Sequence, residues 1–560
     1  MPDKMYLSLQ VFRETTATYI GSQQQDRQGS VTGKEQPISM TRLAGAGLSG
    51  LLLTAAFPAI GKGAVAWFAL VPLLAAVRNL SAPNGFRMGF LTGIVHYLTL
   101  LYWFVPFLNT YGPFPVITCL SILFLLSAYL AIYVGLFSMV ITRLGLSTTA
   151  FLFAVPALWV SLEFIRSSLF GGFPWELLGY TQYRALHIIQ LSDILGVYGV
   201  SFLILLSNGL LFLLYQHVTG AKRQGLRTGN KQVWVCVLGV GGILGIAWCY
   251  GAWRIPMMED GISRARHKRI VIVQGNIDQT EKWDPAYQLS TIEKYLELSK
   301  PEPANRPDLL VWPETAMPFY FVNDDLLTNM VIEGIRSGGT DTLLGSPAYA
   351  WKDGRIQYYN RAFMVLSDGT IADAYDKAHL VPFGEYVPLK RWLPFLGKMV
   401  EHVGDFSTGS VGDTLDWRGH KIGTLICYEL IFPFLSRTAV QNGADLLVNI
   451  TNDAWYGKTS APYQHFSMAV FRAVETRRAL VRSANTGISG FIDPLGRIVS
   501  KTPVFENAVL GEDVPLMSGQ TPYVRHGDIF AVACIIATMG IILGEEKTRI
   551  KSIKKIFRRK

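Results

Sequence analysis

The sequence predicts a helical bundle in a membrane that carries one large α/β domain in water. Three observations support this fold class. Half of the 560 residues are hydrophobic and only 16% are charged, whereas soluble proteins carry nearer a quarter of charged residues. The apolar excess is concentrated before residue 255 and after residue 527. Between these positions short apolar strands alternate with helical stretches, which is the pattern of a layered α/β domain.

Seven apolar stretches precede residue 255 and an eighth follows residue 527, so we expect about eight membrane spans. Several reach the ~20 residues that a helix needs to cross a bilayer. The first, second and fifth are short or broken by Gly and Pro, which a helix buried in a bundle tolerates. We therefore expect about seven helices in residues 43–254 and a last one in residues 528–545. The stretches are Leu43–Ile60, Ala64–Val77, Phe90–Leu108, Val116–Ile141, Ala150–Phe164, Ile188–Leu214, Val233–Trp253 and Ile529–Leu543.

Both ends of the chain are polar. Residues 1–42 are rich in Gln, Ser and Thr, and no apolar core follows a basic start, so they do not resemble a signal peptide. We expect a disordered cytoplasmic extension, although Met40, directly before the first apolar stretch, would also make a natural start. Residues 546–560 form a basic tail that we expect in the cytoplasm.

The basic residues of the short loops predict the orientation in the membrane, because cytoplasmic loops carry an excess of Lys and Arg. Residues 217–232 hold four basic residues and no acid, and the other basic loops alternate with them along the chain. Both termini are then cytoplasmic, and residues 255–527 lie outside the cytoplasm. No basic stripe with interleaved aromatics is present, so the net charge of +10 does not indicate a nucleic-acid partner. The loop residues are Lys222, Arg223, Arg227 and Lys231, with Arg78, Arg87 and Arg143 in the other loops.

Three residues of the α/β domain stand just past a predicted strand or in a loop after one, where sites form in α/β domains. They are Glu314, Lys377 and Cys427, and Cys427 is the one cysteine outside the apolar stretches. A thiolate can attack a carbonyl, a carboxylate can move the protons, and an ammonium can stabilise the oxyanion. Each residue also has a simpler interpretation, as an acid at a helix N-terminus, a surface lysine and a buried structural cysteine. The predicted strands are 269–274, 309–312, 342–346, 361–366, 422–426, 446–450 and 481–484, with helices over 287–299 and 464–480.

The three residues lie in longer motifs that resemble the carbon–nitrogen hydrolase (nitrilase) superfamily, which has a Glu–Lys–Cys catalytic set on an αββα sandwich. With the domain inserted between two predicted spans, the chain resembles more narrowly the apolipoprotein N-acyltransferase family of the Gram-negative inner membrane, through Val273-Gln274-Gly275-Asn276 with Lys282-Trp283-Asp284 and through Phe383-Gly384-Glu385-Tyr386. This resemblance covers about residues 43–545 and implies no metal and no cofactor. The matching motifs are Val273-Gln274-Gly275-Asn276, Lys282-Trp283-Asp284, Trp312-Pro313-Glu314, Asp376–Tyr386, Ile426-Cys427-Tyr428-Glu429, Thr451–Gly457, Arg472-Ala473-Val474-Glu475 and Asn485-Thr486-Gly487.

The family resemblance implies a two-step acyl transfer by a periplasmic domain. Cys427 would take the sn-1 acyl chain of a phospholipid as a thioester and pass it to the α-amine of a diacylated apolipoprotein, in the last step of lipoprotein maturation. Besides the phospholipid donor and the apolipoprotein acceptor, the membrane lipid around the bundle would be a third partner. The residues at the positions of supporting or gating groups are Glu385, Glu429 and Tyr428, and those at positions of possible lipid contact are Trp283 and Trp455.

Two other functions remain open at this point. A membrane-anchored nitrilase-type amidase would release the acid to water, although about eight spans are excessive for an anchor. A transporter or lipid-binding module would not need a complete Glu–Lys–Cys set. The loop after the fifth stretch holds aromatics that could form an interfacial belt or could line a cavity open to lipid. Its notable residues are Glu163, Arg166, Phe173, Pro174, Trp175 and Glu176.

Overall fold

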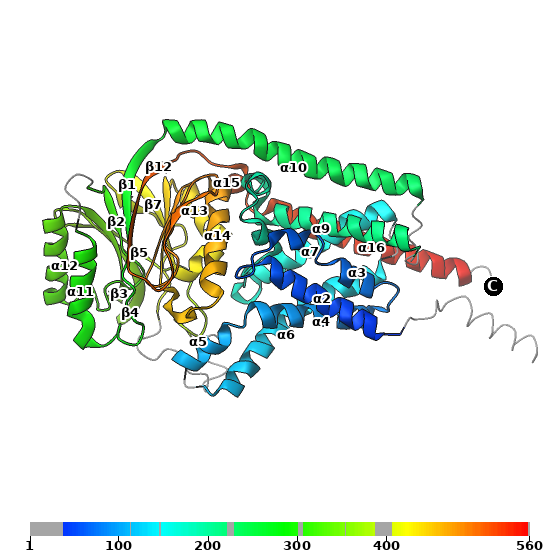
Figure 1. The fold of residues 1–560 in the computed structure, drawn as a ribbon, viewed down its shortest axis with the longest axis horizontal. Helices are drawn as coiled ribbons and strands as arrows, with labels where there is room; N and C mark the ends of the chain where they lie inside the picture. The colour runs from blue at the N-terminus through cyan, green and yellow to red at the C-terminus, as the bar shows by residue number, and fades with distance from the viewer. Residues whose placement is uncertain are drawn as a thin grey trace, which may run out of the picture.

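A computed structural model describes residues 37–112, 114–144, 147–220, 229–300, 306–352, 354–386 and 406–557. The α/β domain lies at one end of an elongated molecule and the helical bundle at the other, with the C-terminus beyond the bundle (Figure 1). Our expectations for residues 1–36 and for the loop residues 221–228 lie outside the described residues.

The bundle consists of long helices joined by short helical turns. Its long helices are α2 (Met40–Ala56), α4 (Ala82–Leu100), α6 (Val116–Arg143), α7 (Thr148–Ser168), α9 (Ser192–Thr219), α10 (Asn230–Arg264) and α16 (Ile529–Phe557). The shorter elements are η1 (Gly63–Trp67), α3 (Val71–Ala76), α5 (Phe104–Tyr111), η2 (Leu169–Gly171), η3 (Leu178–Gln182) and α8 (Leu186–Ile189).

The described residues hold five helices that are long and apolar enough to span a membrane, or six if α4 and α5 form one span bent by 52°. The expected number of eight is therefore approximate, and the difference arises at the start of the chain. There the first predicted stretch forms α2, whose 17 residues measure about 26 Å at 1.5 Å per residue. The second breaks into η1 and α3. Both are short of the ~30 Å hydrocarbon core.

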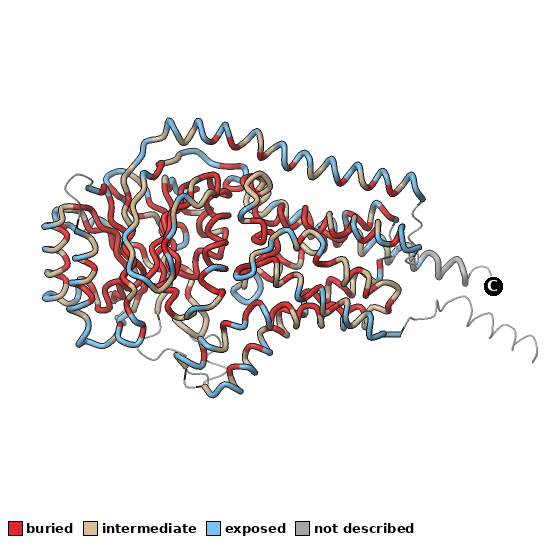
Figure 2. Tube along the Cα trace, in the orientation of Figure 1, coloured by how far each residue is buried: buried red, intermediate tan, exposed pale blue. Residues whose placement is uncertain are grey.

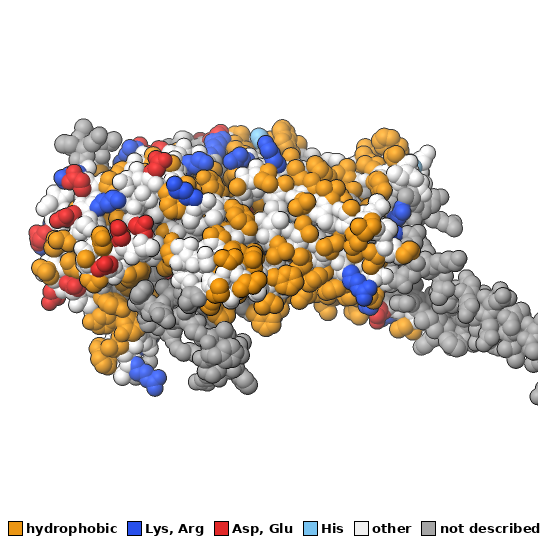
Figure 3. Space-filling view, turned by 60° about the horizontal axis from the view of Figure 1, so that its bottom comes forward, with side chains coloured by type: hydrophobic (Ala, Val, Ile, Leu, Met, Phe, Trp, Pro, Cys, Tyr) orange, Lys and Arg blue, Asp and Glu red, His pale blue; other side chains and the backbone are white. Residues whose placement is uncertain are grey.

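The face of the bundle that Figure 3 shows is mostly apolar. Hydrophobic side chains cover much of it, with a few basic side chains near its far end, while most acidic side chains on this face lie over the α/β domain. On α10 the exposed Trp234 and Trp253 are 19 residues apart, which is about 28 Å of helix and close to the ~30 Å bilayer core. Helix α10 then continues to Arg264, past the expected domain boundary at residue 255, and delivers the chain to the first strand (Figure 1). Its exposed face runs along the whole helix (Figure 2).

The α/β domain contains two six-stranded sheets packed face to face. One sheet has the order β12-β1-β2-β3-β4-β5 and the other β11-β10-β9-β8-β7-β6. The first sheet consists of β1 (Arg266–Gln274), β2 (Leu309–Val311), β3 (Asp341–Lys352), β4 (Arg355–Val365), β5 (Ile371–Asp376) and β12 (Ala508–Leu516). The second consists of β6 (Leu415–Trp417), β7 (His420–Ile426), β8 (Leu446–Thr451), β9 (Leu480–Ala484), β10 (Gly490–Ile492) and β11 (Ile498–Lys501).

Helices cover the outer face of each sheet and complete four layers. Helices α11 (Gln288–Leu298) and α12 (Asp325–Gly338) lie on the outer side of the first sheet, and α13 (Pro433–Gln441) and α14 (Ala461–Thr476) lie between the second sheet and the bundle (Figure 1). Ile272 and Val311 of the first sheet pack with Ile426 and Val448 of the second in one buried core. The predicted αββα sandwich is therefore confirmed.

The strands and helices predicted within the α/β domain are confirmed, although β3 and β4 are longer than predicted and the end of one helix was wrong. We expected a helix over residues 464–480, whereas α14 ends at Thr476 and β9 begins at Leu480. Arg477 ends the helix with a φ of 53°, in the left-handed region. The sequence has no glycine here to mark a helix end. Instead the Arg477 guanidinium is held by Asp193 of α9 at 2.7 Å, a contact that sequence patterns do not contain.

Candidate active site

Cys427 lies where β7 ends and the short helix η5 (Cys427–Ile431) begins. Its φ of 52° lies in the left-handed region, which residues other than glycine rarely occupy. Backbone strain of this kind persists where the surroundings hold a residue in place, and it is concentrated at functional sites. The turn leaves Cys427 at the carboxyl end of β7 with 7% of the residue exposed.

Glu314 follows β2, the central strand of the facing sheet, and is also buried. Its Oε1 accepts a hydrogen bond from Asn360 Nδ2 at 2.8 Å, and its Oε2 accepts one from the Asn452 backbone N–H at 2.8 Å. The neighbouring strand β3 approaches closely because it has Gly345 here, where an added Cβ would lie 2.8 Å from the Glu314 Cα. The carboxylate therefore has a fixed position between the two sheets.

Lys377 comes directly after β5 and brings its ammonium to the same place. Its Nζ lies 2.9 Å from Glu385 Oε1 and 3.5 Å from Glu314 Oε1, and the side chain is 1% exposed. Burial acts to lower the pKa of this ammonium, but Glu385 and Glu314 outweigh it and raise the pKa above its usual value. Lys377 is therefore a permanently charged cation at any physiological pH.

These groups act on the thiol of Cys427. Burial raises the pKa of the thiol above its ordinary value, the Glu314 carboxylate raises it further, and the Lys377 ammonium acts in the opposite direction. The thiol is therefore neutral at rest, and a base must take its proton during attack. The structure therefore places the Glu314 carboxylate, the Lys377 ammonium and the Cys427 thiol in one buried cluster.

Glu429 connects the turn that carries Cys427 to the loop that follows Lys377. Its Oε2 accepts a hydrogen bond from the Ile426 N–H at 2.7 Å, and its Oε1 accepts bonds from the Ala378 N–H at 2.7 Å and the His379 N–H at 2.9 Å. Burial raises the pKa of Glu429 to about 7, against these donors, which lower it. The carboxylate ties the residue before Cys427 to the two residues after Lys377. The supporting role expected for Glu429 stays a prediction, and this geometry favours it.

The other supporting residues lie around the cluster. Glu385 accepts the Lys377 bond on Oε1 and the Val381 N–H at 2.8 Å on Oε2. Tyr428 is buried, with its ring 5.1 Å from that of Phe432. The two residues expected to contact lipid, Trp283 and Trp455, are half-buried, and the ring of Trp455 packs 4.9 Å from Tyr111 of α5 in the bundle.

Sequence patterns missed three polar residues of the site. Asn360 Nδ2 donates to both Glu314 and Glu385, and Asn452 supplies its backbone N–H to Glu314. Lys282 stands within the motif Lys282-Trp283-Asp284 but was not a candidate site residue. Its Nζ lies 3.2 Å from the Glu314 carbonyl oxygen. The register of the β4–β5 hairpin is a signal for Asn360. Arg361 pairs with Asp376, so the preceding residue, Asn360, lies opposite Lys377.

Gln464 is one of several polar side chains that join the α/β domain to the bundle. The Oε1 of Gln464, on α14, accepts hydrogen bonds from Trp103 Nε1 at 3.1 Å and Trp175 Nε1 at 2.9 Å. Its Nε2 donates to the carbonyl oxygens of Pro58 and Leu100 at 3.1 Å each. These four partners belong to the bundle, and Nε2 also donates to Ser460 Oγ of the α/β domain at 3.2 Å, so Gln464 joins the two parts.

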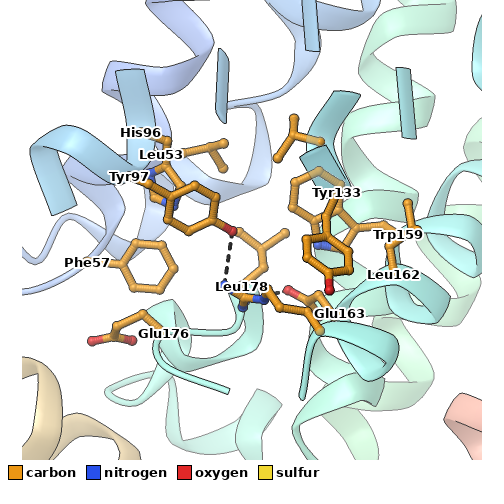
Figure 4. Close-up of a pocket in the computed structure, with 12 residues that line it drawn as sticks. Leu53, Phe57, His96, Tyr97, Tyr133, Trp159, Leu162, Glu163, Glu176 and Leu178 are labelled. Carbon is orange, nitrogen blue, oxygen red and sulfur yellow. Dashed lines mark hydrogen bonds between the residues drawn. The ribbon is translucent and has the colours of Figure 1, made fainter. Parts of the chain in front are cut away.

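A small cavity in the bundle is lined by residues that include Glu163 and Arg166 of α7 and Glu176 of the loop that follows (Figure 4). Trp175 is 1% exposed, so the interpretation of this residue as part of an aromatic belt is wrong. Arg166 donates to the Tyr97 hydroxyl at 3.0 Å, the bond that is dashed in Figure 4. Glu163 and Glu176 are also buried beside the cavity, whose volume of about 30 Å³ is enough for one or two water molecules.

Comparison with known proteins agrees with both parts of the chain. The family described as "Apolipoprotein N-acyltransferase N-terminal domain" matches residues 49–210, and "Carbon-nitrogen hydrolase" matches residues 269–521. Among solved structures, an amidase of the nitrilase superfamily from Nesterenkonia AN1 aligns with 47% of this chain and 94% of its own at 22% identity, with a TM-score of 0.35.

Full-length relatives narrow the class further. The apolipoprotein N-acyltransferase of Geobacter metallireducens is 45% identical over 87% of this chain and 92% of its own length. That of Methylococcus capsulatus is 33% identical over 90% of this chain and 96% of its own length. The fold and the site define a membrane protein with a carbon–nitrogen hydrolase domain that works as an acyltransferase. More narrowly, the chain belongs to the apolipoprotein N-acyltransferase family. Nothing in these relationships favours the amidase alternative.

Proposed function

We propose that Cys427 carries an acyl chain from a phospholipid to the N-terminal α-amine of a diacylated lipoprotein, with Glu314 and Lys377 as its partners. The observation that carries this assignment is the single buried cluster of Glu314, Lys377 and Cys427, fastened through Gln464 to an apolar bundle. Acyl chains can then remain in the bilayer while the reacting carbonyl reaches the thiol.

The first step forms a thioester. Glu314 takes the thiol proton as the sulfur attacks the sn-1 ester carbonyl, and the Lys377 ammonium stabilises the oxyanion that forms. The carbon–oxygen bond of the ester then breaks. Glu314 returns the proton to the leaving glycerol oxygen, and lysophospholipid departs. No proton is gained or lost overall in this step.

The second step forms the amide. The free α-amine of the lipoprotein attacks the thioester carbonyl, Glu314 accepts a proton from the attacking nitrogen, and the carbon–sulfur bond breaks. The proton passes to the sulfur of Cys427 and restores the resting thiol, whose raised pKa makes it a good final acceptor. The acceptor arrives mostly as an ammonium, since α-amines have pKa values of about 7.7–8.0, so this step releases one further proton.

Loading and chase of the purified full-length protein would test this assignment. Incubation with phospholipid alone should add one acyl mass to the peptide that contains Cys427, and a diacylated lipopeptide should then remove it as the triacylated product. A hydrolase would instead lose the adduct to water without an acceptor. Stable loading in the absence of acceptor, followed by transfer, is the expected result. Turnover to free fatty acid alone would contradict the proposal.

We further propose that the α/β domain faces the periplasm of an inner-membrane protein and that both termini are cytoplasmic. The support is the basic loop around Arg223 and Arg227 and the basic C-terminal tail. A reporter active only in the periplasm should be active when fused after residue 515 and inactive when fused within residues 220–230. The reverse pattern in whole cells would invert the topology.

A further inference from the structure

Lys282 is a second buried lysine at the candidate site, in the loop that follows β1. The residue is 1% exposed, and its backbone N–H donates to the Asp278 carbonyl oxygen at 3.0 Å, which fixes the turn that carries it. Its Nζ lies 3.2 Å from the carbonyl oxygen of Glu314. Among the described residues this is its one hydrogen-bond partner, so two of its three N–H groups are free to meet a substrate.

The two buried lysines have opposite surroundings. Lys377 has the carboxylates of Glu385 and Glu314 beside it and stays charged. Lys282 has no carboxylate within 4 Å among the described residues. Burial lowers the pKa of Lys282 to about 8, while Glu314 and Cys427 act weakly in the opposite direction.

No other titratable group acts on Lys282 from the elements packed on it. Glu314 acts from the end of β2 and Cys427 from the end of β7, and these are the only two among the described residues. The acids of its own loop, Asp278 and Glu281, are exposed to solvent. Lys282 therefore exchanges its proton near neutral pH, as an ordinary lysine with a pKa near 10.4 does not.

The second step of the proposed reaction needs such a group. An ammonium must lose two protons to become an amide nitrogen, and Glu314 delivers one of them to the sulfur of Cys427. The other proton has no acceptor in the Glu–Lys–Cys set, because Lys377 is already fully protonated. Two like charges close together in a buried site also oppose each other, so one of the two groups gives up its proton.

We propose that Lys282 and the incoming α-amine share a single proton in the loaded site, with Lys282 taking it so that the amine attacks as the free base. Lys282 first gives its own proton to solvent and then takes that of the amine, so the balance is R–NH₃⁺ + Lys282–NH₃⁺ → R–NH₂ + Lys282–NH₃⁺ + H⁺. This assignment rests on the proposed function, because it concerns the acceptor of that reaction. An α-amine with a pKa of about 7.7–8.0 and this lysine are closely matched as partners.

Proton release on acceptor binding tests the proposal without any turnover. In the Cys427→Ala protein, calorimetry in buffers of different ionisation enthalpy would count the protons released when a diacylated lipopeptide binds at pH 7. Before binding, Lys282 and the α-amine of the lipopeptide are each about nine-tenths protonated at pH 7, because their pKa values are near 8. Binding should therefore release about 0.8 proton. With Lys282→Met added, release should fall to about zero, and an N-acetylated lipopeptide should release none from either protein.

Kinetics give a second, independent measurement. Lys282→Met should form the thioester within about threefold of the wild-type rate. It should transfer the chain about tenfold more slowly at pH 7, since only about a tenth of an α-amine is then neutral, and it should recover by pH 9. Lys282→Gln should fail in the same way, because an amide keeps a polar side chain but takes no proton near neutral pH, and Lys300→Met, at an exposed lysine of the same domain, is the control.

Each outcome decides the question. The assignment would be overturned if Lys282→Met released as many protons as the protein without this change, if Lys282→Met transferred at the full rate at pH 7, or if Lys282→Gln restored transfer. Thioester formation slowed as much as transfer would make Lys282 a positioning residue for Glu314 instead. Absence of lipopeptide binding by the Cys427→Ala protein, or of any thioester in the wild-type protein, would count against the proposed function and not against the lysine alone. If Lys282→Met fails to fold, Lys282→Gln is used for both measurements.

Discussion

Replacement of Cys427 by alanine is expected to abolish acyl labelling of the protein completely. Cys427 is the one cysteine of the α/β domain, it stands at a strained turn at a strand end, and the carboxylate and ammonium of the site act on its thiol. Alanine removes the only group that can form a thioester there, and no neighbouring side chain can replace it. Mass spectrometry after incubation with phospholipid would measure the loss.

The matched controls are two buried cysteines of the bundle. Cys236 on α10 and Cys534 on α16 are as buried as Cys427, but they lie among apolar side chains of helices. Cys236→Ala and Cys534→Ala should retain full labelling. Since alanine and cysteine are similar in size, all three variants should fold, and the Cys427→Ala protein should still bind a diacylated lipopeptide. Full labelling of Cys427→Ala would refute the assignment of the nucleophile.

The sandwich could be predicted because its signals are local. Buried strands such as β2 and β8 appear in the sequence as short apolar runs, and each of Glu314, Lys377 and Cys427 stands just past a strand or in a loop after one. The bundle was less predictable at its start. There α2 and the η1–α3 pair are apolar but too short to span a membrane alone, and both α2 and α3 pack against α4. Hydropathy measures composition and contains no information on that packing.

The remaining site residues depend on contacts between distant parts of the chain. Asn452 reaches Glu314 across 138 residues, and Gln464 reaches Pro58 across 406 residues. No spacing rule connects such positions. The opposite behaviour of Lys282 and Lys377 is also invisible in the sequence, because it depends on which lysine has carboxylates beside it after folding.

Loss of the Lys377 ammonium is expected to slow both half-reactions alike. Its charge lies 3.5 Å from Glu314 Oε1, where it can stabilise the oxyanion of each tetrahedral intermediate. Removal of a main oxyanion donor costs about 2.7–4 kcal/mol, or roughly 10²–10³ in rate. Lys377→Met also leaves the buried carboxylates of Glu385 and Glu314 without a cation, which costs about 3–5 kcal/mol of stability. The unfolding temperature must therefore be measured beside the single-turnover rates.

Glu314→Gln is expected to separate the two half-reactions instead. The carboxylate raises the pKa of the Cys427 thiol, so its neutralisation leaves the Lys377 ammonium as the nearest charge and lowers that pKa. At raised pH the thiol then ionises without a base and forms thioester slowly. Transfer still lacks the acceptor for the proton of the attacking nitrogen, and loss of a general base costs about 10²–10⁴ in rate.

Single-turnover labelling with phospholipid, followed by a chase with diacylated lipopeptide, would measure the two rates of Glu314→Gln separately. We expect thioester that accumulates at high pH and persists through the chase. Glu281→Gln, at an exposed acid of the same domain, should behave as the wild type. If Glu314→Gln forms no thioester at any pH, the carboxylate does more than remove the thiol proton. If the loaded variant transfers at the wild-type rate, another base serves the amine, and Lys282, 3.2 Å from the Glu314 carbonyl oxygen, would be the group to replace next.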